Sequence, residues 1–376
     1  MSITYDILLK GGTVIDSAQG LNALRDVAIT DGVITAIDHD IPKTLAKQTI
    51  SVKNQYVTPG LIDIHTHVYY GVTTWGIKAD NVCSTAGTTT VVDAGSASWA
   101  TFPGFREFIA EPAQTNILNY IHISGIGLVY GPVGEMHDLA YADPDRVADT
   151  LKANRDITVG VKVRQGKTQV GENGVQPLKL AIQAAEQAGM PVMCHIGAGV
   201  PLPGVLELMR PGDVITHCFQ GNGDNIVDEK GTVIPEAWQA QQDGVIFDVG
   251  HGAGSFHYEI AQRAMEQGFI SDVISTDLHT GNINGPVYDL PTTLSKLIHL
   301  GLSFEEVIEK ATFNAAKTIK REKQLGSLKI GTTADVAVFE LLDGEFEFYD
   351  AHGTKFIGAQ KINATLTIRE GEKTSF

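Results

Sequence analysis

The stretch "VTPGLIDIHTH", residues 57–67, joins a Pro-Gly turn to an apolar run that ends in two histidines one residue apart. In a β-strand, side chains two positions apart point to the same face, so His65 and His67 project together while Ile64 and Thr66 project the other way. Two neutral imidazoles that converge on one point suit a metal ion. A buried histidine pair that only hydrogen-bonds to its neighbours is equally compatible with this stretch, so other residues must decide between the two.

The composition predicts a globular protein that acts on a small molecule. Of the 376 residues, 43% are hydrophobic and 19% are charged, which is ordinary for a folded protein. The formal net charge of -16 argues against nucleic acid and anionic membranes as partners and favours a small-molecule substrate. The N-terminal stretch does not read as a secretory signal, and no apolar run reaches the about 18 residues of a membrane-spanning helix. We therefore expect a cytoplasmic protein, and we expect it to form a homo-oligomer.

From residue 60 onward, short apolar or β-branched runs alternate with polar loops and amphipathic stretches. Residues 143–155 predict a helix that begins at an Asp cap and a Pro, and residues 177–189 predict one that ends at a Gly. The runs that predict strands are residues 60–67, 88–95, 116–125, 158–165, 191–197, 213–221, 244–252 and 272–280. Eight alternations predict an α/β fold with a closed TIM-type (β/α)8 barrel. An open doubly wound sheet is the rival, but the chain lacks a G-x-G-x-x-G or Walker A motif.

The two ends of the chain have a different pattern. Residues 1–55 and residues 327–376 contain short alternating strands, and GG and DG pairs in the first range predict hairpin turns. Both ends therefore predict one small β-sandwich domain, discontinuous in sequence, that flanks a barrel domain of residues 56–326. The stretches 170–177 and 279–291 are rich in Gly and Asn, and we expect them to be active-site loops.

Polar residues follow the predicted strands where the chemistry of such barrels gathers, at the C-terminal edge. The strand ends carry His65 and His67, Lys162 and Arg164, His195, His217, His251, and Asp277. Histidines on four strands together with a carboxylate favour a metal site over a set of unrelated buried histidines. Imidazole and carboxylate ligands suit zinc, with manganese, iron or cobalt as alternatives.

Lys162 is the unusual member of this set, because an ammonium beside metal cations would be repelled. Burial and nearby positive charge both lower the pKa of a lysine, which frees the amine as a nucleophile that can take up carbon dioxide. A lysine that reaches toward solvent or pairs with a carboxylate is the alternative interpretation.

Taken together, these motifs resemble the amidohydrolase superfamily, in its dihydroorotase-like branch with two metals. The resemblance runs from "DILLKGGTVID" (6–16) through residues 57–67 to "TFNAAKTIK" (312–320) and "GSLKIGTTADVAVFE" (326–340). It implies two divalent metal ions, with zinc as the first choice, bridged by Lys162 after that side chain is carboxylated by carbon dioxide. It also implies the ligands of each ion: His65, His67 and Asp277 for the more buried one, and His195 and His217 for the more exposed one.

The resemblance further implies a hydroxide, shared by the two metals, that attacks a polarised carbonyl while Asp277 serves as the catalytic acid and base. Dihydroorotases of this family usually carry an arginine two residues past the second histidine, where this chain has Tyr69. The chain is more similar to the deacetylase-type members, which implies hydrolysis of an amide or ester, N-acyl or O-acyl, of a small carboxylate. Dihydroorotase or another cyclic amidohydrolase, and an adenine-type deaminase, remain alternatives. A non-catalytic assembly protein is disfavoured because all six ligand positions are present.

Three residues outside the ligand set are candidates for binding the substrate. Arg164 lies two residues beyond Lys162, so it could bind the substrate carboxylate or form a structural ion pair at the rim. His251 and Tyr130 could contact the substrate or the tetrahedral oxyanion. A packing or loop-stabilising role is open for both of these residues as well.

Overall fold

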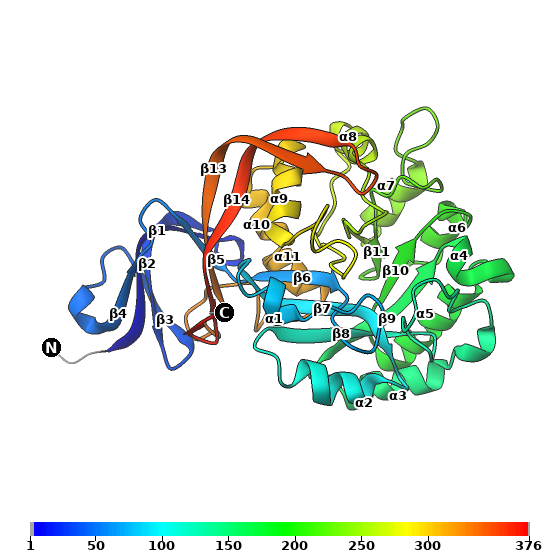
Figure 1. The fold of residues 1–376 in the computed structure, drawn as a ribbon, viewed down its shortest axis with the longest axis horizontal. Coiled ribbons are helices and arrows are strands. Elements are labelled where there is room, and N and C mark those ends of the chain that lie inside the picture. Colours follow the sequence, from blue (N-terminus) through cyan, green and yellow to red (C-terminus); the bar gives the residue numbers. More distant parts are fainter. Residues whose placement is uncertain (1–3, 375–376) are drawn as a thin grey trace.

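The computed structural model describes residues 4–374, and within them two β-sheets organise the chain (Figure 1). One is a parallel sheet of seven strands that curls on itself and carries helices on its outside. The other is a separate mixed sheet, built from both ends of the chain, that lies beside it. None of the helices in the described residues has the length and apolar character needed to cross a membrane.

The strands of the parallel sheet lie side by side in chain order, so their C-terminal ends meet at one edge. They are β6 (Leu61–Thr66), β7 (Thr88–Ser98), β8 (Asn116–His122), β9 (Thr158–Gln165), β10 (Val192–Ile196), β11 (Val214–Thr216) and β12 (Ile246–Asp248). Each of the first seven predicted runs overlaps one of these strands, and β7 extends three residues beyond its predicted run.

The eighth predicted run, residues 272–280, does not form a regular strand. It makes isolated parallel bridges on both of its sides, from Val273 to Asp248 of β12 and from Leu278 to Thr66 of β6. The backbone of Asp277 is left-handed, with φ of 51°, and such a residue interrupts the pleat that a continuous ladder needs. The prediction of a regular strand at this position is therefore wrong.

The helices follow the strands as the alternation predicts. Asp143 caps the first turn of one predicted helix by accepting a hydrogen bond from the amide of Arg146, and Gly189 ends the other in a left-handed conformation, so both predictions are confirmed. The α-helices are α1 (Ala79–Val82), α2 (Phe102–Phe105), α3 (Pro144–Ala153), α4 (Lys167–Val170), α5 (Gln176–Ala188), α6 (Leu202–Leu206), α7 (Pro235–Gln242), α8 (Tyr258–Glu266), α9 (Leu290–His299), α10 (Phe304–Lys310) and α11 (Phe313–Thr318).

The mixed sheet joins the two ends of the chain. It contains β1 (Tyr5–Asp16), β2 (Leu21–Thr30), β3 (Val33–Asp38), β4 (Ala46–Ser51), β5 (Tyr56–Pro59), β13 (Val336–Tyr349), β14 (Lys355–Arg369) and β15 (Glu372–Lys373). Strand β5 pairs in parallel with β1 and antiparallel with β13, so it connects the N-terminal strands to the C-terminal hairpin. The domain boundaries after residues 55 and 326 stay a prediction.

Of the two hairpin turns predicted for the N-terminal strands, one is confirmed and one is wrong. The Asp31-Gly32 pair does turn the chain between β2 and β3, with positive φ at both residues. The Gly11-Gly12 pair instead lies within the continuous strand β1, where the register against β2 shifts between Leu9 and Gly12. Gly11 has a φ of 82°, so it absorbs an irregularity of the strand without reversing the chain direction.

The inner face of the parallel sheet has an apolar layer and a polar layer. On β8, β10 and β11 an apolar residue lies two positions before a polar one on the same face: Tyr120 before His122, Met193 before His195, and Val214 before Thr216. The apolar members belong to one buried cluster with residues of α11. The polar members lie nearer the C-terminal edge, so the fold places them on a packed apolar floor.

Asp16 connects the two ends of the chain and provides a test of the fold. Its buried carboxylate accepts hydrogen bonds from the amide of Leu328 at 2.6 Å and the hydroxyl of Ser327 at 2.9 Å. Asp16→Ala leaves that buried amide unpaired, and we expect the free energy of unfolding to fall by about 1–3 kcal/mol. Chemical denaturation measures the change, and Asp16→Asn, which keeps an oxygen at this position, should lose less. Equal stability of the alanine variant and the unmodified protein would contradict this role.

Candidate metal centre

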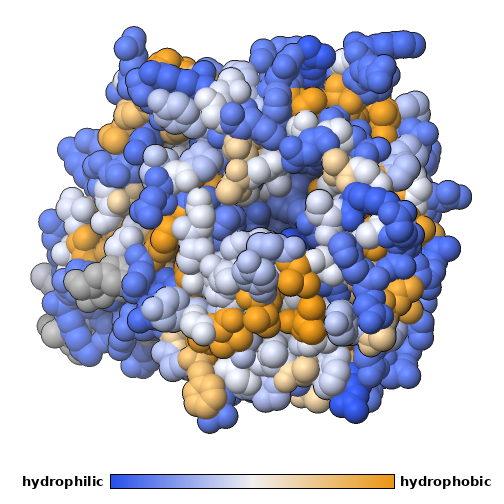
Figure 2. All heavy atoms as spheres, turned by 45° about the vertical axis from the view of Figure 1, so that its right-hand side comes forward, coloured by the Kyte–Doolittle hydropathy of each residue, from blue (hydrophilic) through white to orange (hydrophobic). Residues whose placement is uncertain are grey.

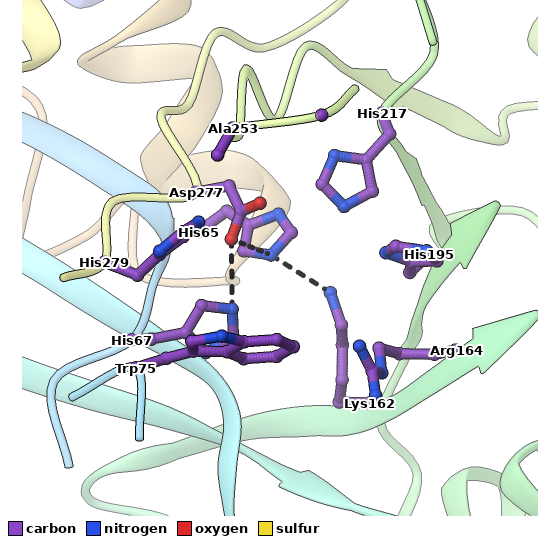
Figure 3. A pocket seen from close by; sticks show the side chains of 11 residues that line it. His65, His67, Trp75, Lys162, Arg164, His195, His217, Ala253, Asp277 and His279 are labelled. Atoms are coloured by element: carbon purple, nitrogen blue, oxygen red, sulfur yellow. Dashed lines mark hydrogen bonds and ion pairs between the residues drawn. The ribbon is translucent and has the colours of Figure 1, made fainter. Parts of the chain in front are cut away.

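The six predicted metal ligands line one cavity of about 360 Å³. The face of the molecule seen in Figure 2 is hollowed near its centre, and hydrophilic residues lie inside the hollow. The complete lining consists of His65, His67, Trp75, Lys162, Arg164, His195, His217, Ala253, Gly254, Asp277 and His279. Figure 3 shows the ligand side chains pointing toward one another from β6, β9, β10, the end of β11 and the segment 272–280. The tertiary structure therefore gathers residues that span more than two hundred positions of the sequence.

Short distances connect the members of this group. His65 Nε2 lies 3.2 Å from Lys162 Nζ and 3.5 Å from Asp277 Oδ1, and His67 Nε2 lies 3.0 Å from the same carboxylate oxygen. Possible ligand atoms of His65, His217 and Asp277 all lie within 4.8 Å of one another. The rings of His195 and His217 meet edge to face, with centroids 4.5 Å apart. Nitrogen and oxygen donors at these separations match the donor set of a transition-metal site.

The Nδ1 atoms of His65 and His217 are held by protein groups, which leaves their Nε2 atoms for the cavity. His217 Nδ1 donates to the carbonyl of Gly250 at 2.6 Å. Thr216 donates its hydroxyl proton to Asp248 at 2.7 Å, so His65 Nδ1, 2.8 Å from that hydroxyl, must be the donor to it. Hydrogen bonds of this kind set the tautomer of metal-binding histidines. The arrangement of donors therefore fits a bound cation.

Burial and the neighbouring groups shift the pKa values of the ionisable side chains in the cavity. Burial lowers the pKa of His217 to about 4 and holds that of His65 well below its usual value, so both imidazoles are neutral at pH 7. Burial also lowers the pKa of Lys162 to about 8, although Asp277 opposes this shift. For Asp277 burial favours the neutral acid, but the imidazoles of His65 and His67 hold the pKa of its carboxyl well below the usual range.

Comparisons with known proteins agree with this geometry. A protein of Brucella anthropi named deacetylase is 36% identical over 94% of this chain and 91% of its own length, and one of Enterococcus faecalis with the same name is 36% identical over 98% of both chains. The profile of the amidohydrolase family matches residues 253–372. This chain belongs to the amidohydrolase family. It is an enzyme, a metal-dependent hydrolase of the kind that acts on carbon–nitrogen bonds.

Solved structures similar to this amidohydrolase have other names. A crystal structure of an adenine deaminase is 34% identical, with a TM-score of 0.91 over 98% of this chain and 99% of that one. A crystal structure of a dihydroorotase is 33% identical, with a TM-score of 0.90 over 98% of this chain and 97% of that one. The shared architecture is therefore compatible with more than one substrate, and the residues of the cavity must distinguish them.

Arg164 of the amidohydrolase forms a buried ion pair, which is one of the two roles that the sequence left open for this residue. Its Nε and Nη2 atoms bind the two carboxylate oxygens of Glu135 at 2.7 and 2.6 Å. Its guanidinium also lies 5.1 Å from the centre of the Trp75 ring. The buried Glu135 carboxylate holds the arginine in one orientation at the cavity wall. Burial raises the pKa of this carboxyl, but Arg164 helps to lower it to about 2.

The other two predicted substrate contacts lie outside the cavity lining. His251 is fully buried, and its Nε2 lies 2.8 Å from Nζ of Lys296. Tyr130 is 56% exposed in the loop between β8 and α3. Contact with the substrate stays a prediction for both residues.

The sequence interpretation missed four residues that line the cavity, and two of them, Trp75 and His279, carry rings. Their rings lie 5.9 Å apart, next to His67. His279 follows Asp277 by two positions, so the alternation rule that paired His65 with His67 could have identified it. Trp75 lies in an irregular loop after β6, where no periodic pattern indicates which way a side chain points.

Thr216 provides a test of the metal centre, because its hydroxyl connects His65 to Asp248. We expect Thr216→Val to weaken zinc binding about 10- to 100-fold, since the imidazole of His65 loses the partner that orients it. Chelator competition measures the affinity. Thr216→Ser keeps the hydroxyl and should bind zinc almost as the unmodified protein does. If the valine and serine variants bind zinc equally well, the hydroxyl does not orient the ligand.

Proposed function

We propose that this amidohydrolase is a deacetylase-type hydrolase that cleaves the amide or ester bond of an N-acyl or O-acyl derivative of a small carboxylate. The observation that carries the proposal is the convergence of four histidines, a buried lysine and an aspartate on one cavity that also presents an arginine. The two relatives named deacetylase, each 36% identical over most of the chain, support the acyl group as the part that is removed.

We propose that the centre holds two divalent ions, with zinc as the first choice, and that Lys162 bridges them as a carbamate formed with carbon dioxide. The low exposure of Lys162, 1%, and the lowered pKa of its amine support this, because an uncharged amine is the form that takes up carbon dioxide. His65 and His67 would bind one ion with Asp277, and His195 and His217 the other. When bound, the ions polarise a carbonyl and lower the pKa of water.

Asp277 is the proposed catalytic acid and base. Its side chain is 14% exposed, so it reaches the cavity, and His67 Nε2 holds one of its oxygens at 3.0 Å. It would accept the proton of the attacking water as the new carbon–oxygen bond forms. It would then return that proton to the leaving nitrogen or oxygen as the old bond breaks. One carboxylate thus serves both halves of the hydrolysis.

Arg164 is the proposed partner of the substrate carboxylate. Within residues 4–374, its hydrogen bonds use Nε and Nη2, so Nη1 is left to bind a ligand at the cavity wall. Tyr69 occupies the position of the dihydroorotase arginine, but its hydroxyl donates to the carbonyl of Thr101 and its ring packs on Phe105. A carboxylate would therefore be recognised from the Arg164 side of the cavity.

We also propose that residues 272–280 take the place of an eighth strand and close the parallel sheet into a barrel. The bridges to β6 and β12, and the hydrogen bonds from the amide of His67 to Leu278 and from that of Val249 to Val273, support closure. The mixed sheet branches at β1, which pairs with β4 along one half and with β5 along the other, and we propose that this branch forms the sandwich.

A substrate screen tests the proposed reaction on zinc-loaded protein. We expect acetate release from N-acetyl or O-acetyl carboxylates, and no comparable turnover of dihydroorotate, hydantoins or adenine. In a Glu135→Gln background, which leaves no buried carboxylate unpaired, Arg164→Met should raise KM for the carboxylate substrate on the order of tenfold or more. The corresponding neutral amide, which lacks the carboxylate, should be unaffected. Ammonia from adenine or ring opening of dihydroorotate without acyl hydrolysis would instead support the alternative functions.

Lys162→Ala tests the bridging role. We expect it to abolish turnover and to reduce the bound zinc, because the alanine cannot form a carbamate between the ions. A short carboxylic acid should restore part of the activity by supplying the missing carboxylate. Lys152→Ala, which changes a lysine on the exposed face of α3, is the control for loss of a positive charge. Unchanged turnover of the Lys162 variant would reject the bridge.

A further inference from the structure

Lys296, on helix α9, is a completely buried lysine that the proposed reaction does not use. Its ammonium has three neighbours at 2.8 Å: Nε2 of His251, the carbonyl of Pro286 and the carbonyl of Tyr349. Three acceptors match the three protons of an ammonium. One side chain thus connects the loop after β12, the segment after residue 280 and the end of β13.

The hydrogen bonds of His251 define its tautomer. Its Nδ1 lies 2.9 Å from the carbonyl of Gly252, which can only accept, so Nδ1 carries the proton. Nε2 of a neutral imidazole then offers a lone pair to Lys296. The ring is fully buried and stacks on Phe256, with centroids 4.7 Å apart. His251 therefore transmits the position of the ammonium to the backbone of its own loop.

That loop forms part of the support of the metal centre. The carbonyl of Gly250 accepts the hydrogen bond of His217 Nδ1 at 2.6 Å, and a Cβ at Gly250 would lie 2.2 Å from the hydroxyl of Thr216. A Cβ at Gly252 would lie 2.7 Å from Oδ2 of Asp277. The backbone at residues 250 and 252 thus contacts two proposed ligands, whereas the side chain between them reaches Lys296.

The cost of burying Lys296 argues against a role in packing alone. Among residues 4–374 no carboxylate forms an ion pair with its ammonium, and burial lowers the pKa of this amine to about 7, so three uncharged acceptors hold it against the cost of burial. Apolar side chains of similar volume usually stabilise such a position as well as a buried charge does, or better. A lysine at this position holds three hydrogen-bond acceptors in a fixed geometry, which an apolar side chain would not do.

We propose that Lys296 is a positioning residue of the metal centre, because its ammonium holds neutral His251 and thereby fixes the backbone of residues 250–252 against His217 and Asp277. Tyr349 is the last residue of β13, and Figure 1 shows the β13–β14 hairpin reaching from the mixed sheet past α9 toward α8. The C-terminal hairpin is thereby connected to the metal ligands through one side chain. The inference rests on the proposed function, since it requires a metal at these ligands.

Lys296→Met tests this role by removing the ammonium while keeping a long apolar side chain. We expect zinc affinity, measured by chelator competition, to fall about 10- to 100-fold, and the visible spectrum of the cobalt-loaded protein to shift. The matched control is Lys310→Met, which removes a partly buried lysine that donates to the carbonyl of Ser271 at 2.7 Å. The control should lower the melting temperature but leave zinc affinity and the cobalt spectrum unchanged.

Variants of His251 keep the inference testable if the Lys296 variant does not fold. His251→Gln retains an acceptor for the ammonium and should bind zinc more tightly than His251→Leu. The double variant Lys296→Met with His251→Leu should bind zinc about as tightly as the weaker-binding of the two single variants. Both changes break the same connection, so their effects should not add.

The outcomes separate this inference from the proposed function. An unmodified protein that binds no zinc after loading would overturn both. If the unmodified protein binds zinc and Lys296→Met changes only the melting temperature, as the Lys310 control does, then Lys296 is structural and the inference alone fails. Equal zinc affinity in the glutamine and leucine variants of His251 would also overturn it.

Discussion

The buried positive charge of Lys162 is the constraint on which the rest of the site depends. Its ammonium lies beside imidazoles whose own pKa values burial lowers, so these rings can offer lone pairs but no compensating charge. Negative charge comes from Asp277 and, one layer away, from Asp248, and both oppose the fall in the pKa of Lys162. An amine in such surroundings loses its proton more readily than one in water, which connects the fold directly to the proposed carbamate.

Around the cavity, three functional side chains are each oriented by a second group behind them. His65 is held by a hydroxyl, His217 by a backbone carbonyl, and Arg164 by a buried carboxylate. These partners lie on different strands and loops, so the geometry of the cavity is established by the folded protein before any ligand arrives. The glycines at 250 and 252 belong to the same arrangement, because any side chain there would collide with the groups that they contact.

The C-terminal hairpin of β13 and β14 belongs to the mixed sheet and also contacts the loop that follows β12. In its connecting turn, the carboxylate of Asp350 accepts a hydrogen bond from the amide of Tyr258, and the amide of Ala351 donates to the carbonyl of Phe256. Together with the contact between Tyr349 and Lys296, these bonds attach the turn to the loop that follows β12. The profile of the amidohydrolase family covers this hairpin as well as Asp277, so the matched region includes both the proposed ligand and the hairpin.

The sequence by itself determined the alternation of strands and helices, the helices at 143–155 and 177–189, and the polar residues at the strand ends. These follow from local periodicity and from the rule that parallel strands present their C-terminal ends at one edge, which is why the six predicted ligands line one cavity. Only the tertiary structure decided that Gly11-Gly12 forms a bulge, that Trp75 faces the cavity, that Glu135 holds Arg164, and that Lys296 meets His251. Each of these depends on a contact between segments distant in the chain or on an irregular backbone, and neither leaves a periodic signal in the sequence.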